Sequence, residues 1–329
     1  MNYNKIRIPL EFPNKPVCKR AKVDTGLKCN LNCYMCYYKH NLKDTELDFN
    51  IIKNRIDFLS KYTDEFDLSG GEPTIHSRWF DILDYCSSKG TVSCLSNGIK
   101  FSNFDFIKKS KEHGLNEILF SLHSVDQIHD QITQIPGSFK LILKAIQNAK
   151  KLDIKIRINS IVSNINYKLV DNKFFDLIEY IKPFEINFLP LNYFSDAKDL
   201  ESTDYNVILD PIKNFIDKSS VKLINVRYVP YCFMAGYEKR VVGYAQHVFD
   251  PYDWNIALYD YLEPTTENLK EQIYQNRLKS YVKHKECINC KYFLICDGIE
   301  PQNNSKIKPV LGDKIINILE YREDFYEHK

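Results

Sequence analysis

Three closely spaced cysteines near the N-terminus are the residues best suited to metal or redox chemistry. Cys29, Cys33 and Cys36 are separated by three and then two residues, and they directly follow a predicted β-strand. Three thiolates can bind three irons of a 4Fe–4S cubane and leave the fourth iron for the amino and carboxylate groups of a small molecule. The alternative is a structural zinc site with His40 as the fourth ligand, although such sites favour paired cysteine spacings.

A second set of cysteines lies toward the C-terminus. Cys287, Cys290 and Cys296 form a C-x2-C-x5-C run, and Cys232 lies upstream of it. Together they supply at most four ligands, which suits one further 4Fe–4S cluster or one structural zinc ion. If Cys232 is not a ligand, two alternatives remain: an open iron binds substrate, or Cys232 acts as a catalytic donor of a hydrogen atom to a substrate radical.

Composition limits the environment and the partners of the protein. Lys and Arg total 45 against 43 Asp and Glu, so the net charge of +2 gives no strong field to attract nucleic acid or an anionic membrane. There is no secretory signal and no apolar run near the roughly 20 residues of a membrane span. We therefore expect a cytoplasmic protein whose ten cysteines are reduced, with Cys18, Cys86 and Cys94 as buried structural thiols.

Short β-rich runs alternate with amphipathic stretches between residues 20 and 192, which predicts parallel strands joined by helices. Strands are expected at 21–26, 65–69, 91–96, 116–122, 154–162 and 184–190. Helices are expected at 48–61, 77–88, 103–113, 138–152 and 170–181. The predicted fold class is α/β: a partial (β/α)6 TIM-type barrel in residues 1–215, followed by a small iron–sulfur domain in residues 216–329.

Several predicted strands carry polar residues at every second position. The polar positions are Asp67 and Ser69, then Lys155, Arg157 and Asn159, then Glu185 and Asn187. A tightly packed parallel barrel buries both faces of its strands and is almost entirely apolar. The pattern favours a wide or incompletely closed barrel whose interior binds a polar ligand, with solvated edge strands as the alternative.

A Gly-Gly-Glu-Pro segment, Gly70 to Pro73, follows the second predicted strand. Gly70 and Gly71 allow the backbone to approach a ligand closely, and the Glu72 carboxylate can accept hydrogen bonds from an ammonium group. Alone, the segment is equally compatible with an ordinary strand-to-helix turn. Together with the three-cysteine run, the segment resembles the sequence motifs of the radical SAM superfamily. In that family the residue before the last cysteine of the run is often aromatic, and here it is Met35.

The resemblance implies a cofactor set and a reaction type. In that family the free iron binds S-adenosylmethionine, and an electron from the cluster cleaves its sulfonium bond to give a 5'-deoxyadenosyl radical. The Gly70, Gly71, Glu72 and Pro73 segment is then expected to bind the methionine amino group. Further cofactor contacts are expected from Asn97, Ser121, His123, Arg157 and Asn159. A family arginine after the fourth strand is absent, since Thr133 and Gln134 occupy that stretch, so Arg157 is expected to bind the methionine carboxylate.

The C-terminal cysteines are similar to those of SPASM and Twitch extensions, which bind auxiliary iron–sulfur clusters. A full SPASM extension has more cysteines, one of them at the position of Glu300. We therefore expect a Twitch-like domain with one auxiliary 4Fe–4S cluster, bound by Cys287, Cys290, Cys296 and Cys232.

The predicted function is that of a radical SAM oxidoreductase. It would abstract hydrogen from an unactivated carbon of a small polar metabolite or sugar, since no leader-peptide domain precedes the barrel, and receive electrons from a flavodoxin- or ferredoxin-like protein. Maturation of a ribosomal peptide, or epimerisation with Cys232 as hydrogen donor, are the alternatives among enzymes. A non-catalytic electron-transfer protein is the alternative from another class.

Overall fold

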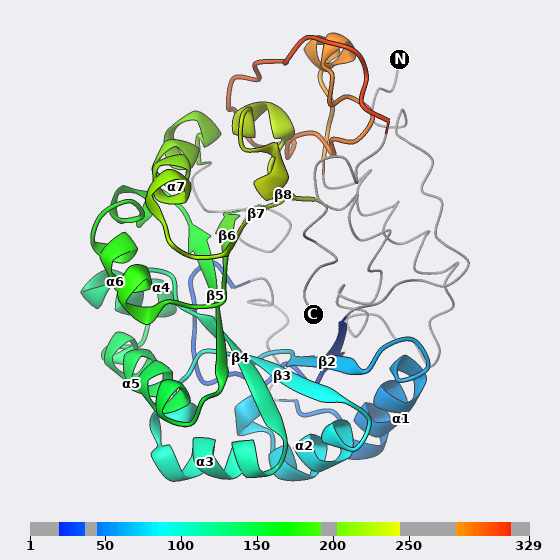
Figure 1. The fold of residues 1–329 in the computed structure, drawn as a ribbon, viewed down its shortest axis with the longest axis vertical. Coiled ribbons are helices and arrows are strands. Elements are labelled where there is room, and N and C mark those ends of the chain that lie inside the picture. The colour runs from blue at the N-terminus through cyan, green and yellow to red at the C-terminus, as the bar shows by residue number, and fades with distance from the viewer. Residues whose placement is uncertain (1–19, 37–44, 192–202, 244–280, 317–329) are drawn as a thin grey trace.

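The structure is a computed structural model that describes residues 20–36, 45–191, 203–243 and 281–316. Eight parallel strands form one sheet and pair in chain order. The strands are β1 (Ala21–Asp24), β2 (Glu65–Ser69), β3 (Thr91–Ser96), β4 (Leu115–Ser121), β5 (Lys155–Val162), β6 (Glu185–Pro190), β7 (Leu223–Arg227) and β8 (Val241–Val242). Figure 1 shows that the sheet is curved, with the helices along its outer side.

Helices connect the strands in the right order for a barrel. They are α1 (Phe49–Leu59), α2 (Trp79–Ser87), α3 (Phe104–Glu112), α4 (Asp126–Thr133), α5 (Ser138–Lys151), α6 (Lys173–Ile181) and α7 (Tyr205–Lys218). The predicted α/β class and partial TIM-type barrel are confirmed. None of the described helices is long and apolar enough to cross a membrane.

The sheet extends further than the six predicted strand–helix units. β7 pairs with β6, and β8 pairs with β7, both in parallel. The predicted division at residue 215 falls within α7, so β7 and β8 follow it in the same sheet. The division into two domains remains a prediction.

Alternating residues of each strand face the helices and the barrel interior. The outward residues are apolar and buried under the helices, as Val23, Leu68 and Ile158 illustrate. The inward residues Asp67 and Arg157 are polar and also buried. Because they lie on strands with neighbours on both sides, the alternative of solvated edge strands is wrong for these positions.

Two of the three cysteines expected to be structural are in the described part of the chain. Cys86 on α2 and Cys94 on β3 are fully buried in the layer between the helices and the sheet. This confirms them as packed thiols. Cys18 and His40 lie outside the described residues.

Candidate functional site

The N-terminal cysteine loop, residues 29–36, begins where β1 meets two neighbouring segments. Just before it, the Lys28 N–H donates to the Thr45 carbonyl (3.2 Å), and the Lys28 carbonyl accepts from the Glu72 N–H (2.8 Å). The Gly71 N–H donates to the Gly26 carbonyl, also at 2.8 Å. Backbone hydrogen bonds therefore fix the start of the loop at the carboxyl end of the sheet, where barrels of this type place their chemistry.

Gly70 and Gly71 are required by this close backbone approach. A Cβ atom at Gly70 would lie 2.3 Å from the Gly26 carbonyl oxygen, and one at Gly71 would lie 2.2 Å from that of Lys28. Gly70 also has a φ of +126°, which favours glycine. In the structure these glycines make room for the chain leading into the cysteine loop.

Glu72 is buried and accepts hydrogen bonds from the end of β3. Its Oε1 accepts from the Thr74 N–H (3.3 Å) and hydroxyl (2.5 Å) and from the Ser96 hydroxyl (2.9 Å). Its Oε2 accepts from the Asn97 N–H at 2.8 Å. Burial raises the pKa of Glu72, and these four donors oppose that rise. Oε2 retains acceptor capacity for a further donor, such as an ammonium group.

Asn97 links β3 to the cysteine loop. Its Nδ2 donates to the Asn30 Oδ1 at 2.7 Å, and its own Oδ1 accepts from the Ile99 N–H at 3.0 Å. Asn30 is the residue next to Cys29, and no pattern in the sequence distinguishes it from other loop residues. Glu72 and Asn97 thus form a chain of hydrogen bonds that ends beside the first cysteine.

The far side of the loop rests on the end of α4. The Asn32 N–H donates to the Thr133 carbonyl (3.3 Å), and the Tyr34 N–H donates to the Ile132 carbonyl (3.1 Å). Met35, at the position that is often aromatic in the family, is buried against Ile132. These contacts could not be predicted, because free backbone carbonyls at a helix end carry no residue-type signal.

The three thiols of the loop form a donor set that fits a cubane. Cys29, Cys33 and Cys36 are all partly exposed. Burial raises the pKa of Cys29 to about 11, and the charges of Glu72 and Cys36 add to the rise. A cubane takes one thiolate on each of three irons, so one loop with three thiols supplies a suitable set of ligands.

His123 presents a neutral imidazole at the carboxyl end of β4. Burial lowers its pKa to about 3, and its Nδ1 accepts from the Ile161 N–H at 3.2 Å. The hydrogen is therefore on Nε2, which makes that atom a donor. His129 is packed beside it, as its Nδ1 accepts from the His123 N–H. Among the other predicted contacts, Ser121 and Asn159 are half-buried neighbours across β4 and β5.

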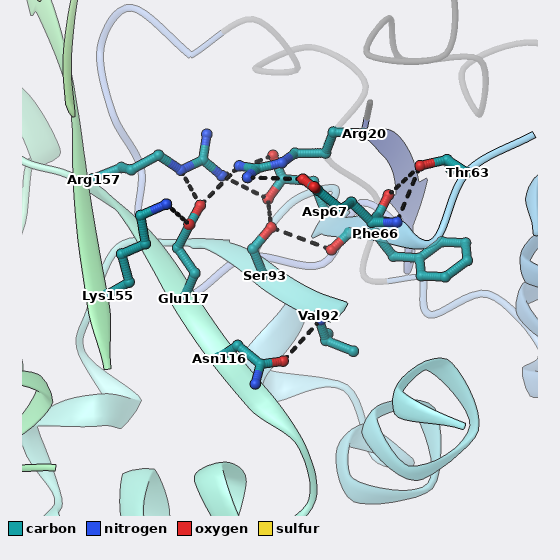
Figure 2. A network of polar contacts seen from close by, with 11 residues as sticks. Arg20, Thr63, Phe66, Asp67, Val92, Ser93, Asn116, Glu117, Lys155 and Arg157 are labelled. Atoms are coloured by element: carbon teal, nitrogen blue, oxygen red, sulfur yellow. Dashed lines mark hydrogen bonds and ion pairs between the residues drawn. The ribbon is translucent and has the colours of Figure 1, made fainter. Parts of the chain in front are cut away.

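Arg157 belongs to a buried ion network inside the barrel, shown in Figure 2. Its guanidinium forms ion pairs with Glu117 and with Asp67, the latter at 3.3 Å. Glu117 also pairs with Arg20 (2.8 Å) and Lys155 (3.2 Å). Although burial raises the pKa of Glu117, Arg157 and Arg20 lower it to about 2. Arg157 is thus already neutralised by the protein, and its contact with a cofactor carboxylate remains a prediction.

The C-terminal cysteine pocket is defined by Cys232, Cys287, Cys290 and Cys296, which line one cavity. Burial raises the pKa of Cys232 strongly, and the charges of Cys296, Cys290 and Cys287 add to the rise. Burial also raises the pKa of Cys296 to about 11. The structure thus brings Cys232 together with three cysteines that follow it by more than fifty residues, as the sequence predicted.

Glu300 attaches the segment after this pocket to the barrel. Both of its carboxylate oxygens lie 2.7 Å from the Tyr205 hydroxyl, on the first residue of α7. The Tyr205 N–H donates to Ser305 at 2.7 Å. Burial raises the pKa of Glu300 to about 7. Glu300 is thus a docking contact between this segment and α7.

A family model for the radical SAM superfamily matches residues 23–180, from β1 to α6. This stretch contains both the N-terminal cysteine loop and the Gly70–Pro73 segment. This part of the chain is a radical SAM domain. The family uses a 4Fe–4S cluster and S-adenosylmethionine, as the sequence predicted.

Curated relatives of the radical SAM domain have varied names. The chain is 29% identical over 169 residues to 7,8-dihydro-6-hydroxymethylpterin dimethyltransferase of Methanocaldococcus jannaschii, covering 49% of this chain and 33% of that protein. It is 27% identical over 185 residues to Fe-coproporphyrin III synthase of Methanosarcina barkeri, covering 55% and 46%. The matches thus span less than half the length of these two relatives.

Solved structures share the fold over most of the chain. Streptococcus suis SuiB, bound to the precursor peptide SuiA, has a TM-score of 0.61 at 13% identity, covering 88% of this chain and 73% of that one. The protein anSMEcpe with bound AdoMet has a TM-score of 0.59 at 16% identity, covering 92% and 96%. At these identities the likeness shows a shared fold and no more.

Proposed function

We propose that this chain cleaves S-adenosylmethionine at a 4Fe–4S cluster held by Cys29, Cys33 and Cys36, and then removes hydrogen from a C–H bond of a small polar metabolite or sugar. The observation that carries the proposal is the position of the N-terminal cysteine loop. Three thiols come from one loop that follows β1, and the chain leading into this loop is bonded through its backbone to the Gly70–Pro73 segment. This arrangement leaves one iron of a cubane without a protein ligand.

Side chains around the loop are suited to hold and orient the cofactor. The free acceptor position on Glu72 Oε2 suits the methionine ammonium group. The Nε2–H of His123 and the half-buried Ser121 and Asn159 supply further polar contacts at neighbouring strand ends. When bound, the cluster and S-adenosylmethionine supply a 5'-deoxyadenosyl radical; the residues position it and exclude water.

The barrel interior supports a polar substrate. Beyond the ion network, Asn187 donates to Glu185 at 2.7 Å, and Asn225 donates to Asn187 at 3.0 Å. All three side chains are buried on the inner face of the sheet. The inner face of the sheet thus carries amide and carboxylate groups that suit a polar substrate better than an apolar one.

The C-terminal cysteine pocket supports a Twitch-like extension with one auxiliary cluster, within residues 216–329. Four thiols on one cavity suit a cubane without an open iron, so Cys232 is proposed as a ligand rather than as a hydrogen donor. These four cysteines would hold the cluster, which would supply an acceptor for the electron that the substrate radical loses on oxidation, in keeping with an oxidoreductase. A flavodoxin- or ferredoxin-like protein then supplies electrons to the N-terminal cluster.

Anaerobic turnover tests the proposal. The full chain, reconstituted with iron and sulfide, should bind about eight irons and form 5'-deoxyadenosine from S-adenosylmethionine with dithionite as reductant. A Cys36→Ala chain, prepared in parallel, should form none. Adding deuterium-labelled small polar metabolites should transfer deuterium into 5'-deoxyadenosine, whereas labelled peptides should not. Absence of 5'-deoxyadenosine from the wild-type protein would refute the proposal.

A further inference from the structure

A buried lysine shares the C-terminal cysteine pocket with the four thiols. Lys283 is 5% exposed and lines the same cavity. Its ammonium group donates to the Phe293 carbonyl, in the turn between Cys290 and Cys296, and lies 4.6 Å from the Phe293 ring centre. Lysine is almost never fully buried unless its charge is paired, and these contacts fix the ammonium within the pocket.

The backbone around the cysteine run is shaped to admit this side chain. Val282 and Ile299 pair through two backbone hydrogen bonds, at 2.7 and 3.0 Å. A Cβ atom at Gly298 would lie 2.3 Å from the Val282 carbonyl oxygen and 3.3 Å from the Lys283 Cγ. Gly298 has a φ of +103°, so glycine is favoured there on both counts. Gly298 thus leaves room for the Lys283 side chain beside the cysteine run.

The charge of Lys283 acts on the thiols of the pocket. Burial raises the pKa of Cys296 to about 11, and Lys283 is the first influence that opposes this rise. Burial also raises the pKa of Cys287, again against the charge of Lys283. A cluster bound by four thiolates is negatively charged, and it becomes more so when it gains an electron. A fixed positive charge in a buried site therefore stabilises the reduced state more than the oxidised one.

We propose that Lys283 sets the reduction potential of the cluster in the C-terminal cysteine pocket, by holding a buried positive charge that favours the reduced form. This inference rests on the auxiliary cluster proposed above. Lys283 is a positioning and electrostatic residue, not a ligand, and it makes the auxiliary cluster the better electron acceptor of the two.

A potential measurement on the C-terminal cluster alone tests this role. The full chain carrying Cys29→Ala, Cys33→Ala and Cys36→Ala retains only the C-terminal ligands, and should bind about four irons. It is titrated anaerobically with dithionite, which gives one electron to the cluster with no bond made or broken, and the reduced cluster is followed by EPR. Adding Lys283→Met should lower the equilibrium constant for reduction about tenfold, a shift of about 59 mV to more negative potential.

Matched variants separate charge from structure. Lys283→Arg should keep the wild-type potential, and Lys283→Gln should show the shift while keeping an N–H donor for the Phe293 carbonyl. Lys285→Met removes an exposed charge two residues away and should leave the potential unchanged. If Lys283→Met does not bind the cluster, the reduction potential of Lys283→Gln tests the proposal instead.

The outcomes distinguish this inference from the proposed function. A bound cluster whose potential is the same in Lys283→Gln as with the native lysine overturns the role of Lys283 and leaves the auxiliary cluster standing. A protein that holds zinc or no metal at these four cysteines overturns both. A shift of equal size in Lys285→Met also contradicts the inference, since it would show that any nearby charge has the same effect.

Discussion

The N-terminal cysteine loop and the C-terminal cysteine pocket differ in the charged side chain that acts most strongly on a thiol of each site. Burial raises the pKa of Cys29 to about 11, and the carboxylate of Glu72 adds to that rise. Burial raises the pKa of Cys296 to the same level, but there the ammonium of Lys283 opposes it. A negative neighbour disfavours the addition of an electron and a positive one favours it, which agrees with the electron transfer proposed for the two sites.

The two regions also differ in how they are supported. The N-terminal loop forms backbone hydrogen bonds to the end of α4, and the residues just before it, Gly26 and Lys28, accept from the Gly70–Pro73 segment. The C-terminal pocket contains short turns and isolated bridges, such as Val282 with Ile299, and is joined to the barrel through Glu300 and Tyr205. The first site is thus part of the barrel framework, whereas the second depends on a few docking contacts.

The largest expected effect separates the chemical roles of the two regions. Cys36→Ala and Cys290→Ala should each reduce the iron content from about eight to about four per chain, because each removes one cubane. Only Cys36→Ala should abolish 5'-deoxyadenosine formation, since only the N-terminal iron has an open position. Iron analysis and chromatography of the reaction products measure both quantities. Loss of 5'-deoxyadenosine in both variants would remove the distinction.

The stability that Glu300 gives to the attachment of the C-terminal region should depend on pH. Burial raises the pKa of Glu300 from 4.5 to about 7, so the folded state binds this proton more tightly than the unfolded chain. The contribution of Glu300 to stability is therefore present below pH 4.5 and is lost as the pH rises through 7. The loss amounts to up to about 3 kcal/mol.

Unfolding of the metal-free protein by urea at several pH values measures this effect. Glu300→Gln should remove this part of the pH dependence while keeping an acceptor for the Tyr205 hydroxyl. Glu112→Gln, on the exposed surface of α3, serves as the control and should behave like the wild type. Equal pH profiles for wild type and Glu300→Gln would contradict the buried, protonated carboxyl group.

A smaller effect tests the backbone hydrogen bonds between the Gly70–Pro73 segment and the chain leading into the N-terminal loop. In Gly71→Ala the new methyl group would lie 2.2 Å from the Lys28 carbonyl oxygen, so the loop must shift. Overpacking of this kind costs about 1–3 kcal/mol, and the N-terminal cluster should be lost from the purified protein. Gly137→Ala, at a φ of +82° with nothing within 4 Å of the added Cβ, should lower stability but retain all the iron. Full iron content in Gly71→Ala would show that the close backbone approach at Gly71 is not needed for cluster binding.

The smallest expected effect concerns the hydrogen bond between Asn97 and Asn30. Asn97→Ala removes this 2.7 Å contact, which is worth about 1 kcal/mol, and leaves the backbone bond from residue 97 to Glu72. Iron release to a chelator should become about fivefold faster from the N-terminal cluster and stay unchanged for the C-terminal one. Asn116→Ala removes a comparable bond at the opposite end of β4 and should not alter either rate.

Much of the barrel could be predicted from the sequence. The ranges 65–69 and 91–96 coincide with β2 and β3, because each strand is apolar on the face under the helices and bounded by turn residues. β8 has only two residues, too few to show a period, and α4 follows Val125 without a capping side chain to mark its start. The grouping of Cys232 with the C-terminal run followed from cysteine spacing and resemblance, and the structure brings these residues together.

The electrostatic surroundings of both sites could not be predicted. Arg20 and Glu117 are 97 residues apart and pair only because the sheet brings them together. The inward position of Arg157 on β5 places it beside Glu117 and Asp67, which are far from it in the sequence. The role of Lys283 depends on the pairing of Val282 with Ile299, which no periodic pattern indicates. These features arise from tertiary contacts between charged residues that sequence alone does not connect.

The most direct test of the account is EPR spectroscopy of each reduced cluster with and without S-adenosylmethionine. The chain carrying Cys287→Ala, Cys290→Ala and Cys296→Ala retains the N-terminal cluster, and its signal should change when S-adenosylmethionine is added, because the cofactor binds the open iron. The chain carrying Cys29→Ala, Cys33→Ala and Cys36→Ala should give a signal that S-adenosylmethionine leaves unchanged. A response from the C-terminal cluster alone would contradict the account.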